Sequence, residues 1–126
     1  MVTRRVLVVE DDPSVRGLLQ AILEDEDLDV ILAADGQEGL KLALSVHPNV
    51  VVLDVMMPGL GGPEVIRRLR RADGTLPFGV LVVTGAAEIV QSLRHELGAE
   101  AVIEKPFDIA VLAGRVKALA EAHDYS

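Results

Sequence analysis

Residues 50–59 read Val-Val-Val-Leu-Asp-Val-Met-Met-Pro-Gly, an unbroken aliphatic run that meets a single carboxylate and then a Pro-Gly turn. Four consecutive branched apolar residues bounded by turn formers are typical of a strand buried on both faces, and such strands occur in parallel sheets covered by helices. Asp54 therefore lies at the carboxyl end of a buried strand, which in open α/β sheets borders the ligand crevice. Asp54 is the first candidate functional residue, although a lone Asp at this place can also simply solvate a loop.

Similar aliphatic runs recur along the chain. The segments between them have apolar residues at the intervals of an amphipathic helix. Strict alternation of strand and helix predicts a parallel sheet with right-handed crossovers and helices on both faces. Of the two common doubly wound strand orders, five β-α units favour the flavodoxin-like order 2-1-3-4-5, with the switch point between the first and third strands. We therefore predict one α/β domain over residues 1–126, with strands at 6–9, 30–33, 50–53, 80–83 and 101–103.

Capping signals place the helices between these runs. Asp12-Pro13 predicts the start of the first helix, and Asp35 followed by Glu38 predicts the start of the second. The third is expected from Pro63 to Asp73-Gly74, and the fourth to stop at Gly98. The fifth is expected to start at Asp108. Helical spacing puts Leu18 on the apolar face of the first helix and Ile109 on that of the fifth.

Composition excludes several classes of function. The 126 residues carry 20 acidic against 12 Lys and Arg residues, a net charge of −8, which disfavours nucleic acid and anionic membranes as direct partners. Only Phe78, Phe107 and Tyr125 are aromatic, too few to stack on bases or a flavin ring. There is no cysteine, and no apolar run long enough to span a membrane. A cytoplasmic protein whose partner is a cation or a basic protein surface is the expectation.

Polar side chains follow four of the predicted strands. Glu10 and Asp11 follow the first, Asp54 the third, Thr84 the fourth, and Lys105 comes just beyond the fifth. Each has a plain explanation as a loop or surface residue. Together, however, three carboxylates in one crevice repel one another unless a cation is present, and an oxygen-only ligand set favours Mg²⁺. The histidines His47, His95 and His123 fall at no strand end, and we predict that they face solvent.

This set of groups has the chemistry that phosphoryl transfer requires. A carboxylate can accept the phosphoryl group as an aspartyl phosphate, and Asp54 would be that nucleophile. Glu10 and Asp11 would hold the metal. Lys105 would contribute a mobile positive charge and Thr84 one hydrogen bond.

Four motifs in this chain resemble the receiver domain of two-component response regulators. They are Val8-Val9-Glu10-Asp11-Asp12, Leu53 to Gly59, Val83-Thr84-Gly85 and Glu104-Lys105-Pro106-Phe107. The resemblance implies Mg²⁺ binding by Asp11, Asp54 and the backbone carbonyl of Met56, with Glu10 acting mainly through water. It implies a phosphoryl group taken from a histidine kinase or phosphotransfer protein, and a signal passed to an output protein or effector domain. It also implies no enzymatic activity beyond self-catalysed transfer and slow autodephosphorylation, and a cis Lys105-Pro106 peptide.

The chain also departs from the family pattern. Val102 stands where the family usually has an aromatic residue, Gly85 where it often has alanine, and Gly61-Gly62-Pro63 where it commonly has Asp-Gly and an aliphatic residue. Three alternatives remain open at this point. An aspartyl-phosphate phosphatase would usually carry a second Asp where this chain has Met56, and an FMN carrier would need a Ser/Thr/Gly-rich first loop. The third is a receiver-like scaffold that is not phosphorylated.

Overall fold

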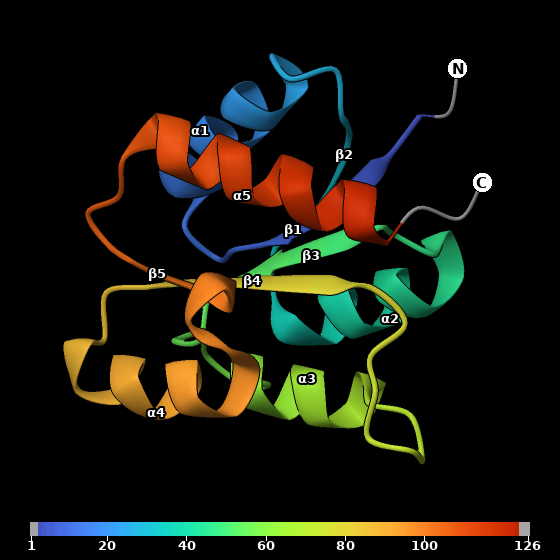
Figure 1. The fold of residues 1–126 in the computed structure, drawn as a ribbon, viewed down its shortest axis with the longest axis vertical. Helices are drawn as coiled ribbons and strands as arrows, with labels where there is room; N and C mark the ends of the chain where they lie inside the picture. The colour runs from blue at the N-terminus through green and yellow to red at the C-terminus, as the bar shows by residue number, and fades with distance from the viewer. Residues whose placement is uncertain (1–2, 124–126) are drawn as a thin grey trace.

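The computed structural model describes residues 3–123, and the other residues of the predicted domain, Tyr125 among them, lie outside the described part. Five strands alternate with five helices along the chain (Figure 1). The strands are β1 (Arg5–Val9), β2 (Asp29–Ala33), β3 (Val50–Leu53), β4 (Gly79–Thr84) and β5 (Val102–Glu104). The helices are α1 (Pro13–Glu24), α2 (Gly36–Val46), α3 (Gly62–Leu69), α4 (Ala87–Leu97) and α5 (Ile109–Ala122), with a short 3₁₀ turn, η1 (Ala99–Ala101).

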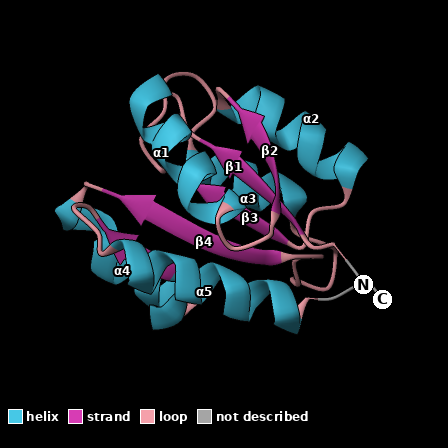
Figure 2. Cartoon of the chain, turned by 90° about the horizontal axis from the view of Figure 1, so that it is seen from above, coloured by secondary structure: helices cyan, strands magenta, loops and turns pink. Residues whose placement is uncertain are grey.

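The five strands form one parallel sheet in the order β2-β1-β3-β4-β5, as the sequence predicted. Figure 2 shows the strand arrows running in a common direction between the helices. The register pairs Val9 with Leu53, so the residues that follow them, Glu10 and Asp54, leave the sheet at the same level. Parallel pairing therefore brings the predicted site residues to one edge.

Helices cover both faces of this sheet. In Figure 1, α1 and α5 lie above the sheet, and α2, α3 and α4 lie below it. Successive strand residues alternate between the two resulting cores: Val6 and Val8 pack toward α1 and α5, whereas Leu7 and Val9 pack toward the other three helices. Burial on both faces explains why these strands are continuous aliphatic runs rather than alternating ones.

The helices differ in how their first turns are capped. Aspartate side chains cap three of them: Asp12 accepts hydrogen bonds at the start of α1, Asp35 at α2 and Asp108 at α5. The residues at the corresponding positions of α3 and α4 are Gly61 and Ala86, and neither makes a side-chain capping bond. The two helices without such a cap are the ones that follow Asp54 and Thr84.

Some sequence predictions were wrong in detail. Helix α3 ends at Leu69, not at 73–74, because Arg70 is extended and residues 71–75 form their own turn, with Gly74 at a φ of 88°. Strand β5 is shifted to residues 102–104 by the η1 turn. Leu18 and Ile109 were expected on buried faces but are 46% and 55% exposed. Leu18 points away from the sheet because the adjacent Leu19 takes the buried position, and Ile109 is the first residue of α5, one turn before the buried Leu112.

The amino ends of the strands lie opposite the predicted site residues, and the buried side chain of Asn49 links β1 to the end of α5 there. Its Oδ1 accepts the Arg5 N–H at 2.8 Å, and its Nδ2 donates to the carbonyl of His123 at 2.6 Å. His123 is half-buried and contacts the Leu119 carbonyl, whereas His47 and His95 are exposed as predicted. No helix within residues 3–123 has the length and apolarity needed to span a membrane.

Candidate functional site

The loop from β1 to α1 supplies the first two acidic residues of the site. Glu10 is only 2% exposed, and its Oε1 accepts the Asp12 N–H at 3.2 Å. Its own N–H donates to the Ala33 carbonyl of β2 at 3.1 Å. The Arg16 guanidinium donates to the carbonyls of Glu10 at 2.9 Å and Asp11 at 3.4 Å, so α1 holds this loop from its first turns. Sequence reasoning missed Arg16, and no pattern in the chain distinguishes it from a surface arginine.

Asp54 follows β3 and is 8% exposed. Its N–H donates to the Val9 carbonyl at 3.2 Å, which continues the pairing with β1 for one more residue. Its Oδ1 accepts the Met56 N–H at 3.0 Å. Glu10, Asp11 and Asp54 each offer one carboxylate oxygen, and these three oxygens lie within 4.8 Å of one another. The predicted convergence of the three carboxylates is present in the fold.

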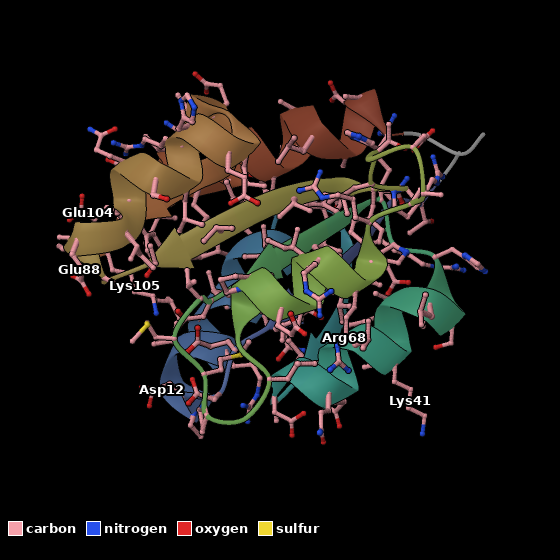
Figure 3. The ribbon with its side chains drawn as sticks, turned by 90° about the horizontal axis from the view of Figure 1, so that it is seen from below. Asp12, Lys41, Arg68, Glu88, Glu104 and Lys105 are labelled. Atoms are coloured by element: carbon pink, nitrogen blue, oxygen red, sulfur yellow. The ribbon has the colours of Figure 1, made fainter. Side chains whose placement is uncertain are left out.

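Lys105 reaches this cluster from beyond β5. Its Nζ lies 3.2 Å from Asp54 Oδ2 and 3.6 Å from Glu10 Oε2. Its backbone N–H donates to the Thr84 carbonyl at 2.8 Å, and the Lys105-Pro106 peptide is cis, as the family resemblance implied. Figure 3 shows Lys105 on the side of the molecule that also carries Asp12, away from Lys41 and Arg68.

Thr84 and Met56 lie beside these charged groups. The Thr84 side chain is fully buried at the end of β4, and its Oγ accepts the Ala86 N–H at 3.0 Å. The Met56 side chain is 62% exposed, and its backbone is held to Asp54 by the N–H described above. Thr84 is therefore hydrogen-bonded within its own loop, while Met56 is tied directly to the acidic cluster.

The electrostatics of the site reflect crowding of carboxylates. Burial, together with the negative charge of Asp54, raises the pKa of Glu10 from 4.5 to about 7. The Asp12 N–H and the Lys105 charge oppose this shift but do not cancel it. Burial alone would lower the pKa of Lys105, but its hydrogen bond to Asp54 and the charges of Asp54 and Glu10 raise it overall. Lys105 thus stays cationic, and one ammonium does not neutralise the cluster.

The model of the response regulator receiver domain family matches residues 6–117. The chain belongs to this family. This receiver domain is 43% identical over 117 residues to the alkaline phosphatase synthesis transcriptional regulatory protein PhoP of Bacillus subtilis, covering 92% of the chain and 48% of the relative. It is 36% identical over 121 residues to the DNA-binding dual master transcriptional regulator RpaA of Synechocystis, covering 95% of the chain and 50% of that protein. The chain thus spans about half the length of the curated relatives it matches.

Solved receiver structures have the same fold. The receiver domain of the Francisella response regulator 1452 superposes with a TM-score of 0.83 at 27% identity, covering 97% of this chain and 100% of that one. The chemotaxis protein CheY4 of Vibrio cholerae superposes with a TM-score of 0.79 at 28% identity, covering 94% and 99% of the two chains. Response regulator receivers are signalling domains rather than conventional enzymes, and this receiver has an acidic cluster that could bind a metal ion.

Proposed function

We propose that this receiver is a phosphoacceptor that takes a phosphoryl group onto Asp54 in a Mg²⁺-dependent reaction. The observation that carries the proposal is the convergence of Asp54 with Glu10, Asp11 and Lys105, three carboxylates and one ammonium from three strand ends. We further propose that residues 1–126 act as one receiver domain. The cytoplasmic location expected from the sequence stays a prediction.

The donor set fits a hard divalent cation. When all four groups are ionised, three carboxylates face one ammonium, which leaves two negative charges in a crevice where Glu10 and Asp54 are buried. Mg²⁺ prefers oxygen ligands to His or Cys. Burial and the negative charge of Asp54 raise the pKa of Glu10, and a bound cation would offset that negative charge. Asp11, Asp54 and the Met56 carbonyl would hold the ion, with Glu10 acting mainly through water. Bound Mg²⁺ would offset the negative charge of the phosphoryl oxygens.

Asp54 would attack the phosphorus of a phosphohistidine on a histidine kinase or phosphotransfer protein. The new O–P bond forms as the P–N bond breaks, and the imidazole leaves with the electron pair. The Met56 N–H at 3.0 Å fixes one Asp54 oxygen, and Lys105 at 3.2 Å stands beside the other. Lys105 would stabilise charge on the transferring group, since its raised pKa keeps it protonated.

Thr84 is suited to sense the product. Its Oγ already accepts the Ala86 N–H, so the hydroxyl proton remains available to donate to a phosphoryl oxygen. Movement of Thr84 would disturb the Ala86 N–H bond at the start of α4, which has no side-chain cap. This change would be read by an output protein or effector domain. Turnover is limited to self-catalysed transfer and slow autodephosphorylation.

Mass spectrometry tests the proposal. After incubation with Mg²⁺ and a small phosphoryl donor, the wild-type chain should gain one phosphoryl group, and Asp54→Asn should gain none. Omitting Mg²⁺ should also prevent the adduct. An adduct that survives Asp54→Asn would remove the central claim, and rapid multiple turnover of the donor would favour the phosphatase alternative instead.

A further inference from the structure

The loop that follows Asp54 is closed at its base by very close backbone contacts. Gly62 donates its N–H to the Val55 carbonyl at 3.2 Å, which joins the two ends of the loop. A methyl group on Gly62 would come within 2.7 Å of the Asp54 carbonyl oxygen and 2.9 Å of the Val55 Cα. Such distances exclude any side chain at this position, so the loop requires glycine for space.

A second contact supports the same loop from outside. A methyl group on Gly36, the first residue of α2, would overlap the carbonyl oxygen of Leu60 and lie 2.9 Å from its carbonyl carbon. The φ of Gly36 is not left-handed, so its backbone conformation is open to other residues. Glycine is needed at this position because the Leu60 backbone leaves no space for a side chain. The start of α2 and the loop after Asp54 are therefore in direct backbone contact.

The start of α2 is itself firmly placed. Asp35 accepts the Glu38 N–H at 2.8 Å, and Glu38 in turn accepts the Ala34 N–H at 2.8 Å. One turn on, Gly39 packs against Val9 of β1, where a methyl group would meet a Val9 methyl carbon at 2.7 Å. Helix α2 is thus fixed to the strand that precedes Glu10, and it presents Gly36 to the loop that follows Asp54.

We infer that Gly36 is a positioning residue for the metal and phosphoryl site. It acts through its contact with Leu60, which fixes the position of residues 55–61 relative to the sheet. The position of these residues in turn fixes the Met56 backbone, which is hydrogen-bonded to Asp54. This inference rests on the proposed function, since it concerns the Mg²⁺ site built on Asp54 and Met56. A bulkier residue at position 36 displaces the loop and separates the Met56 carbonyl from the carboxylates.

The test compares Mg²⁺ affinity in Gly36→Ala and Gly79→Ala by isothermal titration. Gly79 is the matched control, because a methyl group there crowds Leu119 at 3.1 Å and His123 at 3.2 Å, at the opposite edge of the sheet. Gly36→Ala should lose stability, because the added methyl group meets backbone atoms of Leu60. Gly36→Ala should also lose about tenfold or more in Mg²⁺ affinity, as removal of supporting groups around metal ligands does, whereas Gly79→Ala should bind as the wild type does. Equal affinities in the two variants overturn the inference.

A gentler pair of variants decides the question if Gly36→Ala does not fold. Glu38→Ala removes the acceptor that fixes Ala34 without adding bulk, and Glu88→Ala removes one exposed charge from the first turn of α4. Weaker Mg²⁺ binding in Glu38→Ala than in Glu88→Ala supports the inference, and equal binding overturns it. If the wild-type chain binds no Mg²⁺, the proposed function fails instead, so the two failures are distinguishable.

Discussion

Lys105 Nζ lies 3.2 Å from Asp54 Oδ2, although β4 separates the strands that these two residues follow. The lysine therefore reaches across one strand and places its positive charge beside the acidic cluster. Glu10 Oε2 lies 3.6 Å from the same ammonium. Lys105 is thus an ion-pair partner of two of the carboxylates that a metal cation would need, and its positive charge would disfavour binding of that cation.

Lys105→Ala should retain Mg²⁺ binding and strengthen it by roughly 1 kcal/mol, about fivefold in Kd, because a competing positive charge is removed. Signalling should fail even when Asp54 is phosphorylated. Titration calorimetry measures the first effect, and binding of the phosphorylated variant to its output partner measures the second. Lys117→Ala, which removes an equal charge paired with Glu26 in the turn after α1, is the control and should change neither. Normal partner binding by phosphorylated Lys105→Ala would make Lys105 an ordinary surface lysine.

Asp11→Ala should abolish the increase in melting temperature that Mg²⁺ produces, because the native cluster binds the ion and the unfolded chain does not. Asp12→Ala should keep that increase but lower the metal-free stability by about 1 kcal/mol, since Asp12 caps α1 through Ser14 and Val15. Thermal melts with and without Mg²⁺ separate the two. If the variants exchange these behaviours, the metal ligand is Asp12.

The raised pKa of Glu10 predicts a pH dependence of stability. In the unfolded chain Glu10 titrates near 4.5, and in the metal-free fold near 7, so the fold holds a proton that the unfolded chain releases between these values. This contribution to stability is fully present below pH 4.5 and is lost as the pH rises through about 7. Mg²⁺ competes with this proton, so its stabilising effect should grow over the same interval. Melts from pH 5 to 8 check both trends.

Glu10→Gln is the control for the pH prediction, because glutamine does not titrate. The part of the pH dependence due to Glu10 should disappear in that variant. A metal-free melting profile that is identical in Glu10→Gln and the wild type would show that Glu10 ionises normally.

Phosphorylation of Asp54 should change the conformation mainly of the loop after β4. Val102 is fully buried against the α4 side of the sheet, is too short to take up the space that a moving Thr84 vacates, and has little rotamer freedom. The response should therefore concentrate at Thr84, Gly85 and Ala86. Amide NMR shifts with and without a phosphoryl mimic test this. Changes at Val102 and along α5 as large as those at Thr84 would refute a loop-centred switch.

Much of this architecture could be predicted from local sequence. The runs at 6–9 and 50–53 are buried on both faces and so have an unmistakable pattern, and the Asp caps at 12, 35 and 108 mark helix starts through a local bond. The end of α3 was missed because Gly74, which reads as a helix stop, serves a separate turn.

The contacts that position the site could not be predicted in this way. Arg16 donates to the backbone carbonyl of Glu10, and Gly36 contacts the backbone of Leu60, which is distant in sequence. Neither contact produces a hydrophobic periodicity that could be recognised in the sequence. The convergence of Asp54 and Lys105 was predictable only after the strand order had been assumed. What sequence reasoning supplied was the list of charged groups at one edge; tertiary packing supplies their distances.

The uneven capping of the helices divides the molecule into parts of unequal local stability. Helices α1, α2 and α5 begin with a carboxylate that satisfies free backbone N–H groups, whereas α3 and α4 begin with Gly61 and Ala86. Amide protons in the first turns of α3 and α4 should therefore exchange with solvent through small local openings, while those of the other helices should require larger ones. The segments next to Asp54 and Thr84 would thus be the ones that rearrange at least cost, without unfolding the sheet that holds them.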